Sequence, residues 1–316
     1  MTNDQIVDKA DLAISDLTGT GGYLNPMQAN TFIRMLIDQP TIVKAIRTYP
    51  MNAPTMEINK IGFSGRILKP APASGTALSQ SNRSKPTTDQ VTLTSTEVIA
   101  EVHLPYDVIE DNIERGNLED TVMALISAQA SLDVEDLVIN GNTSTGADAF
   151  LRLRNGILAQ ATSHIVDFQD SADRSVSKTI FKHGLKAMPS KYSSNRPALR
   201  FYTSPSCEIE YADSLANRET VLGDTKINTW AKNSAYGVPV VAAAKMPNTQ
   251  YILCHPKNII LGIQRQIMIE TDRDIRSRVL IIVLTMRLDV KFEEEDAIVK
   301  GTGFLPDDDT PTTTTA

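Results

Sequence analysis

Two strand-like runs, Thr55 to Leu68 and Val91 to Leu104, enclose a segment that fits poorly inside a compact core. The sequence between them, PAPASGTALSQSNRSKPTT, is small and polar and contains three prolines. A connection of this length is uncommon within a compact domain and is usually functional or disordered. In the second run Val98, Ala100 and Val102 alternate with polar or outward positions, which is typical of a half-buried strand. We therefore predict a long two-stranded hairpin with a mobile tip.

Charge is segregated along the chain in a way that singles out this hairpin. Residues 58–88 contain no acidic residue and carry five cations, namely Lys60, Arg66, Lys69, Arg83 and Lys85. The C-terminal stretch is acidic, with Glu293, Glu294, Glu295, Asp296, Asp307, Asp308 and Asp309 against Lys300 alone. A basic hairpin gains nothing from cations inside its own subunit, but it can dock on the acidic surface of another. The alternative, that both segments are solvated surfaces, stays open on charge alone.

The overall composition narrows the class of protein. A chain of 316 residues with 41% apolar and 22% charged residues is typical of a globular protein with a sizeable core. The net charge of −7 excludes a protein that coats itself in nucleic acid through a globally basic surface, but not one that encloses DNA. The N-terminus lacks the features of a signal peptide, and the two cysteines cannot build a disulfide framework. These features favour a reducing cytoplasm as the place of synthesis.

Further elements indicate a mixed α+β fold. Asn25-Pro26 opens a predicted helix that ends at Pro40, and Asn117 caps a longer helix that runs to about Ile139 and stops at Gly141. Met286, Leu288, Val290 and Phe292 alternate with polar residues, which predicts a strand. The acidic turn EEED follows, and we predict that Ala297-Ile298-Val299 return as the next strand.

Residues with catalytic or metal-binding potential form no recognisable site. The four histidines are far apart, and Cys254 and His255 are neighbours on a predicted strand, where they point to opposite faces. The glycines in TGTGG lack the Gly-Lys-Ser/Thr ending of a phosphate loop, and EEED does not match a calcium loop. We predict no catalytic, cofactor-binding or metal-binding residue.

Several segments, in order, resemble the major capsid proteins of tailed bacteriophages, which share the Hong Kong ninety-seven fold. These segments are GGYLNPMQANTFIRMLIDQPTIVKAIRTYPMNAPTMEINKI, the basic hairpin, LEDTVMALISAQASLDVEDLVINGN, YGVPVVAAAKMPNTQYILCHPKNIILGI and RLDVKFEEEDAIVKG. The hairpin lies where that family has its E-loop, and the long helix resembles the family's spine helix. Each motif alone is weak, but five in the correct order are fairly specific.

The resemblance implies a division of the chain into parts. The expected parts are an N-arm with the first helix (1–54), the E-loop hairpin (55–102), a peripheral domain (103–155 and 279–305), an axial domain (156–278) and a disordered tail (306–316). The E-loop cations Lys60, Arg66, Lys69, Arg83 and Lys85 would contact an adjacent subunit, and the acidic residues Glu293, Glu294, Glu295 and Asp296 would form the partner surface.

The implied function is a structural one. The chain would assemble with itself into pentamers and hexamers of an icosahedral or prolate shell that encloses double-stranded DNA, without sequence-specific binding and without a membrane. Its further partners would be a scaffolding protein, separate or cleaved, a portal and a decoration protein. It would be assembled in the host cytoplasm. Two alternatives remain: an encapsulin, a shell of the same fold that encloses enzymes, and a mixed α+β enzyme with an unrecognised site.

A covalent cross-link between subunits is not expected. In some members of the resembled family an E-loop lysine joins an asparagine near the C-terminus of a neighbour. Lys60, Lys69 or Lys85 could supply the amine, but no asparagine follows Asn258 in this sequence. Boiled, reduced virions should therefore run as a single band near the monomer mass on a denaturing gel. A ladder of covalent oligomers would contradict this prediction.

Overall fold

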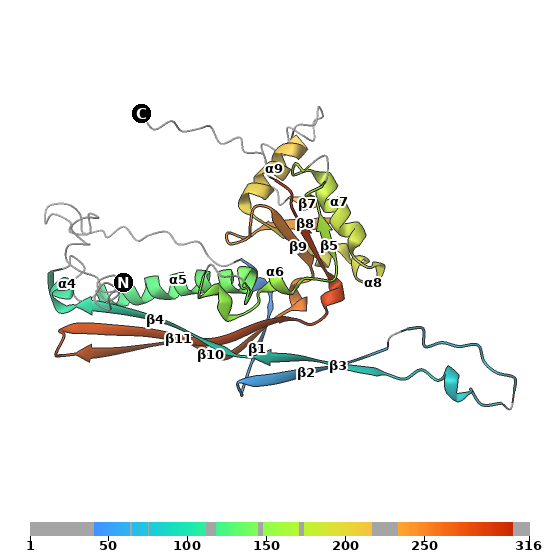
Figure 1. Cartoon of the computed structure of the whole chain (residues 1–316), viewed down its shortest axis with the longest axis horizontal. Helices are drawn as coiled ribbons and strands as arrows, with labels where there is room; N and C mark the ends of the chain where they lie inside the picture. The colour runs from blue at the N-terminus through green and yellow to red at the C-terminus, as the bar shows by residue number, and fades with distance from the viewer. Residues whose placement is uncertain are drawn as a thin grey trace.

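The computed structural model describes residues 41–63, 65–74, 76–111, 118–144, 148–170, 174–216 and 233–305 (Figure 1). Its helices are α3 (Ile42–Ala45), α4 (Tyr106–Asp111), α5 (Leu118–Asn140), α6 (Ile157–Gln160), α7 (Lys178–Ala187), α8 (Ser190–Ser193) and α9 (Pro205–Ala216). Its strands are β1 (Arg47–Pro50), β2 (Thr55–Gly62), β3 (Thr87–Thr94), β4 (Thr96–Pro105), β5 (Ile165–Asp167), β6 (Arg200–Thr203), β7 (Ser234–Ala235), β8 (Val238–Ala242), β9 (Gln250–Cys254), β10 (Ile259–Asp274), β11 (Val279–Phe292) and β12 (Ile298–Thr302). The predicted α+β class is confirmed.

A four-stranded sheet with the order β1-β10-β11-β4 and the helix α5 form the elongated body of the molecule (Figure 1). Buried and half-buried residues alternate along most of β11, where Leu280, Ile282 and Leu284 are buried. Fourteen extended residues span about 46 Å at 3.3 Å each, and the 23 residues of α5 span about 35 Å at 1.5 Å each. The helix can therefore cover most of the length of the strand.

The C-terminal half of α5 lies inside the main hydrophobic core. Val134, Leu137, Val138 and Ile139 are all buried, although acidic residues lie among them in the sequence. Gly141 ends the helix as predicted, and its amide donates to the carbonyl of Leu137. A Cβ at Gly141 would lie 2.3 Å from the carbonyl oxygen of Arg154, so only glycine fits this crossing. No helix in the described part of the chain is long and apolar enough to span a membrane.

A second, six-stranded sheet has the order β5-β12-β9-β6-β8-β7. Helices α7 and α9 cover it through an aromatic core in which the rings of Phe181 and Tyr211 lie 4.7 Å apart. The strand predicted after the acidic turn is confirmed as β12, but it does not return against the preceding strand, because it pairs with β9 and β5 instead of β11. The physical reason is burial: Ile298 belongs to the main core and Val299 to the aromatic core, so this strand is covered on both faces.

This sheet topology also corrects the predicted boundaries between the two larger domains. Strand β10 was placed in the axial domain (156–278), yet it pairs with β1 and β11 in the four-stranded sheet. Strand β12 was placed in the peripheral domain (279–305), yet it lies in the six-stranded sheet. The chain thus crosses between the two sheets twice near its end, once before Ile259 and again at the acidic turn.

A buried carboxylate on α5 binds the backbone at the start of α3. The backbone amides of Thr41 and Ile42 donate to Glu135, at 2.8 and 2.6 Å from its Oε1 atom. Glu135 is 1% exposed, so these amides provide the hydrogen bonds that a buried charge requires. The predicted helix between Asn25 and Pro40 and the predicted tail 306–316 lie outside the described residues.

Candidate subunit interface

Strands β2 and β3 form the base of an arm that extends away from the body (Figure 1). They pair antiparallel from Thr55 opposite Thr94 to Gly62 opposite Thr87. Beyond the ladder, residues 63–86 connect the strands, and their described part contains only one short 3-10 turn. We call residues 55–94 the hairpin arm. The predicted two-stranded hairpin is confirmed, although its paired part is shorter than the strand-like runs of the sequence.

The hairpin arm exposes large apolar side chains from the end of β2 onward. Ile61 is 76% and Leu68 is 84% exposed, and Phe63 and Ile67 are each about half exposed. None of these four side chains belongs to a hydrophobic core of the described residues. An exposed apolar surface of this kind usually marks a contact with another protein.

The root of the arm is fixed to the body by packing and by a buried polar network. Met51, Leu93 and Ile260 form a small core there. The amide of Thr94 donates to Asp289 at 2.7 Å, and the guanidinium of Arg154 donates to the carbonyl of Thr94. Burial raises the pKa of Asp289 above its ordinary value, although the bond from Thr94 and the charge of Arg154 oppose this. The arm is therefore anchored where β3 passes into β4.

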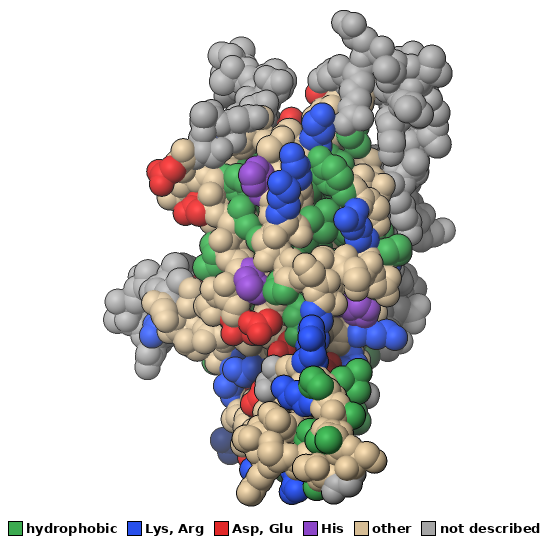
Figure 2. Space-filling view, turned by 90° about the vertical axis from the view of Figure 1, so that its right-hand side faces the viewer, with side chains coloured by type: hydrophobic (Ala, Val, Ile, Leu, Met, Phe, Trp, Pro, Cys, Tyr) green, Lys and Arg blue, Asp and Glu red, His purple; other side chains and the backbone are tan. Residues whose placement is uncertain are grey.

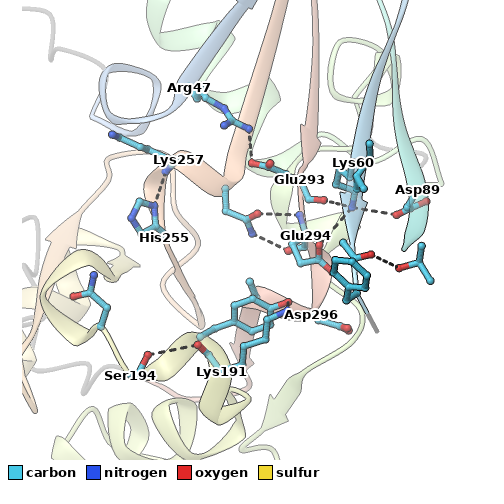
Figure 3. Close-up of a pocket in the computed structure, with 18 of the residues that line it drawn as sticks. Arg47, Lys60, Asp89, Lys191, Ser194, His255, Lys257, Glu293, Glu294 and Asp296 are labelled. Atoms are coloured by element: carbon cyan, nitrogen blue, oxygen red, sulfur yellow. Dashed lines mark hydrogen bonds and ion pairs between the residues drawn. The ribbon is translucent and has the colours of Figure 1, made fainter. Parts of the chain in front are cut away.

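A cation in the arm meets the acidic turn of the same chain (Figure 3). The Nζ atom of Lys60 lies 3.1 Å from Asp89 and 3.5 Å from Glu294, and it donates to the carbonyl of Glu293. Burial lowers the pKa of Lys60, but the hydrogen bond to Asp89 and the charge of Glu294 outweigh this and raise it overall. Glu293 in turn pairs with Arg47. These contacts hold the base of the arm against the turn.

The structure thus divides the residues that we predicted to meet between subunits. Lys60, Glu293 and Glu294 contact one another within one chain, which corrects the expectation that the hairpin gains nothing inside its own subunit. The other four predicted cations lie on the exposed outer part of the arm: Arg66, Lys69, Arg83 and Lys85. None of them forms an ion pair in the described part of the chain. Asp296 is exposed, while Glu295 binds residues 162 and 163.

Glu295 gives the acidic turn a pH-dependent anchor. Its Oε1 atom accepts bonds from the hydroxyl and amide of Thr162 and from the amide of Ser163. These bonds, led by the hydroxyl of Thr162, lower the pKa of Glu295 below its ordinary value of 4.5. A carboxylate with a lowered folded-state pKa contributes stability above its unfolded-state pKa, and this contribution is lost as the pH falls through the folded-state pKa.

We expect Glu295→Ala to lower the free energy of unfolding at pH 7 by roughly 1 to 2 kcal/mol, because it removes a charged acceptor of several hydrogen bonds. The difference from the parent chain should shrink as the pH falls below about 4.5. Urea unfolding of the unassembled chain at several pH values measures this. Asp296→Ala, at the exposed neighbouring position, is the matched control and should show little difference at any pH. An effect of Glu295→Ala that does not vary with pH would contradict the prediction.

A cleft of about 1,020 Å³ separates the base of the hairpin arm from the six-stranded sheet unit (Figure 3). Lys191, Tyr192 and Lys257 line one side, and Ile61 and Phe63 line the other. The cleft adjoins His255, whose Nδ1 atom accepts the amide of Lys257. Burial, aided by nearby positive charge, lowers the pKa of His255, so it is neutral at pH 7. The lining of the cleft therefore mixes cations such as Lys191 and Lys257 with the carboxylates of the acidic turn.

The thiols and carboxylates of the described residues form no recognisable reactive or metal-binding cluster. Cys207 and Cys254 are buried, and burial raises the pKa of Cys254 to about 12, so this thiol stays protonated near neutral pH. No group of three or more His, Cys, Asp or Glu side chains in the described residues could hold a metal ion.

Sequence reasoning missed two residues that anchor the arm and one that binds the backbone at α3. Asp289 and Arg154 anchor the root of the arm, and Glu135 accepts hydrogen bonds from the amides at residues 41 and 42. Neither carboxylate carried a clear signal, because Asp289 alternates in step with Arg287 and Lys291, and Glu135 lies between Asp133 and Asp136. Such a carboxylate is buried only where hydrogen-bond donors meet it.

Comparisons with known proteins agree on one family. A model of the phage capsid family matches residues 21–303. The "Putative prophage capsid protein YqbE" of Bacillus subtilis (strain 168) is 46% identical over 312 residues, which cover 95% of this chain and 98% of that protein.

Solved structures show the same fold at much lower identity. The satellite phage P4 procapsid including size determination (Sid) protein matches with a TM-score of 0.66 at 12% identity, covering 94% of this chain and 99% of its own. The structure of Microbacterium phage Oxtober96 matches with a TM-score of 0.63 at 13% identity, covering 94% of this chain and 100% of its own. The holo-SrpI encapsulin complex from Synechococcus elongatus PCC 7942 matches with a TM-score of 0.60 at 12% identity, covering 93% of this chain and 96% of its own. The fold therefore does not separate capsids from encapsulins, whereas the sequence relatives do.

Proposed function

The chain belongs to the phage capsid family and is a major capsid protein that forms a virion shell, and we propose that its hairpin arm joins adjacent copies in that shell. One copy would lay residues 63–86 over the next, so that Ile67 and Leu68 lose their exposure to water. The cations on the outer part of the arm would meet acidic groups of the neighbour. The observation that carries this proposal is the arm itself, which is fixed at its root. Beyond the root it exposes apolar side chains, and basic side chains that form no ion pair with the described residues.

We also propose a division of the chain into two larger units, with boundaries that follow the two sheets. The unit that packs around the symmetry centres would comprise residues 156–258 and 298–305, and the body would comprise residues 96–155 and 259–292. The acidic turn, residues 293–297, connects the two. Repeated contacts around a closed shell then combine weak interfaces into a stable assembly.

The shell would enclose double-stranded DNA without sequence-specific contacts and without catalytic activity. Assembly in the host cytoplasm would need a scaffolding protein and a portal, and a decoration protein would bind the finished head. The satellite phage P4 procapsid, which includes a size determination protein, supports the expectation that a shell of this fold assembles with an accessory protein.

Assembly of the purified chain tests this function directly. We expect size-exclusion chromatography with light scattering to show megadalton particles or discrete pentamers and hexamers, and electron microscopy to show closed shells. A chain that stays monomeric or dimeric with crowding agents and its scaffolding protein would overturn the proposal. Particles from the native source should contain DNA. An enzyme inside them, with no DNA, would favour an encapsulin-type compartment.

A further inference from the structure

A small cavity lies where the chain crosses from the six-stranded sheet to the four-stranded sheet. It has a volume of about 390 Å³ and is lined mainly by the start of α3, by β6 and by the turn of residues 255–258 between β9 and β10. The turn also borders the larger cleft at the base of the hairpin arm, but α3 and β6 do not. We call this cavity the basic pocket. The polar residues that line it are Thr41, Arg200, Tyr202, His255 and Lys257.

The lining of the basic pocket is positive and contains no aspartate or glutamate. The Nη1 atom of Arg200 donates to the carbonyl oxygens of Pro197 and Leu199, at 2.5 and 2.7 Å, and these bonds hold the guanidinium in place. Neither Arg200 nor Lys257 forms an ion pair in the described part of the chain. Two cations at one cavity without a carboxylate partner attract an anion from solution.

His255 is affected by the positive charge of the basic pocket. Burial lowers its pKa, and the charges of Lys257 and Arg200 lower it further, so both cations lie close enough to act on the imidazole. Its Nδ1 atom accepts the amide of Lys257 at 3.1 Å (Figure 3), so the neutral ring carries its hydrogen on Nε2. The ring can therefore donate a hydrogen bond from Nε2, and an anion in the pocket would stabilise its charged form.

The hydroxyl of Tyr202 gives a second, independent indication of a ligand. Tyr202 lies two residues after Arg200 on β6, so the two side chains share one face of the strand. Tyr202 is 1% exposed, and its hydroxyl has no hydrogen-bond partner among the described residues. Burial raises the pKa of this hydroxyl, so it stays protonated and remains a donor at neutral pH. A buried donor without an acceptor is unfavourable unless a ligand or water binds it.

The segment around the basic pocket is also positive. Residues 174–207 contain seven lysines and arginines, Arg200 among them, and no aspartate or glutamate. Figure 2 shows Lys and Arg side chains recurring over the six-stranded sheet unit above the hairpin arm. Glu135, whose charge reaches Tyr202, is buried and already accepts the amides of Thr41 and Ile42. The segment therefore supplies no acidic side chain that could neutralise the pocket.

We propose that the basic pocket binds a phosphate group through Arg200, Lys257 and the hydroxyl of Tyr202. A guanidinium binds phosphate through two parallel hydrogen bonds, and an ammonium adds a compact positive charge. Donors that come from both β6 and the turn suit a tetrahedral anion, whose oxygens accept bonds from several directions, better than the two oxygens of a flat carboxylate. The inference needs no second copy of the chain and does not depend on the proposed function.

A phosphate group in the basic pocket would stabilise the junction of the two sheets. Arg200 and Tyr202 belong to the six-stranded sheet, whereas Lys257 lies directly before β10 of the four-stranded sheet. The wall formed by α3 is fixed to the main core through Ile42. The ligand would thus connect elements of both units, and its binding to the folded chain would raise the melting temperature.

Binding of inorganic phosphate to the unassembled chain tests the basic pocket. We expect saturable binding in calorimetric titrations at constant ionic strength, with chloride as the reference anion. Binding should raise the pKa of His255, measured by NMR of the imidazole carbons, and leave the other three histidines unchanged. His255→Gln identifies the signal to be followed.

Charge removal at the pocket has a matched control on α7. Arg200→Gln with Lys257→Gln should lower the affinity for phosphate by at least roughly tenfold, because it removes both cations of the pocket. Lys182→Gln with Lys186→Gln removes the same charge from exposed positions and should leave the affinity unchanged. If the first variant does not fold, Lys257→Gln alone, at an exposed position, replaces it and should lower the affinity several-fold.

Tyr202→Phe separates binding of a ligand from a structural role. The hydroxyl has no partner in the described part of the chain, so we expect an unchanged melting temperature in chloride. The affinity for phosphate should fall by roughly three- to tenfold, because the variant loses one donor to the anion. A tyrosine with a merely structural role would leave this affinity unchanged.

Free phosphate and the DNA backbone both offer the proposed group, and a short DNA duplex distinguishes them. The duplex is added at the same concentration of phosphate groups. Competition with inorganic phosphate, together with a raised pKa of His255, would identify backbone phosphate as a ligand, whereas no competition would restrict the pocket to free phosphate. Either result supports the pocket. No saturable binding of phosphate, an unchanged His255, or equal affinities of the pocket variant and the α7 control would overturn the proposal.

Discussion

Tyr251→Ala should lower the free energy of unfolding of the unassembled chain by about 3 to 5 kcal/mol, the cost of removing a large aromatic side chain from a packed core. The ring of Tyr251 is completely buried, and it lies within 6 Å, between ring centroids, of Phe181, Phe201 and Phe304. It joins α7 to three parts of the six-stranded sheet unit. Its loss leaves a cavity at the centre of the aromatic core. Chemical denaturation followed by circular dichroism measures the effect.

Two matched variants separate packing from hydrogen bonding at this position. The hydroxyl of Tyr251 donates to the carbonyl of Ile180 at 3.2 Å, so Tyr251→Phe should cost only about 1 kcal/mol. A Cβ at Gly301 would lie 2.1 Å from the Tyr251 ring, so Gly301→Ala should destabilise the parent by about 1 to 3 kcal/mol. In the Tyr251→Ala background this cost should be much smaller. Additive effects of the two substitutions would show that the ring and the glycine do not share the packing that we describe.

The elements that sequence predicted well are those whose pattern is local. The helix α5 is a long run rich in apolar residues that ends at Gly141, and β11 from Met286 onward has apolar residues at every second position. The outer half of β10 carries no such pattern. Its sequence from Gln264 to Asp274 is mostly polar, because β1 pairs only as far as Ile263 and leaves this half at the edge of the sheet. Pairing with β11, and not its own side chains, makes it a strand.

The errors in the sequence-based prediction arise where distant segments meet. The return strand after the acidic turn was placed beside its neighbour in sequence, but Asn258 binds the backbone of Glu294 and the chain turns into the other sheet. Likewise, Lys60 and the acidic turn are 233 residues apart in sequence, so charge segregation indicated an attraction without showing that it lies within one chain.

Because Lys60 contacts the acidic turn of its own chain, the cations farther out on the arm are the better test of a contact between subunits. Lys60 is only 21% exposed in its side chain and has partners in its own chain, so changing it would disturb the base of the arm as well as any contact between subunits. Arg83 and Lys85 are exposed, lie beyond the β2–β3 ladder and have no ion pair in the described part of the chain. They are therefore the cations through which a contact between subunits can be tested without disturbing the fold.

Reversing Arg83 and Lys85 to glutamate should abolish most assembly while leaving the melting temperature of the unassembled chain unchanged. A single exposed ion pair contributes only about 0.2 to 1 kcal/mol, but every copy repeats the contact, and reversal replaces attraction by repulsion. We expect the yield of particles, measured by light scattering and electron microscopy, to fall by at least roughly tenfold, which corresponds to about 1.4 kcal/mol of free energy. Arg83→Gln with Lys85→Gln, which removes attraction without adding repulsion, should give an intermediate yield that depends less on salt than the parent's. Normal particles from the glutamate variant would show that the arm docks through its apolar residues alone, or does not dock.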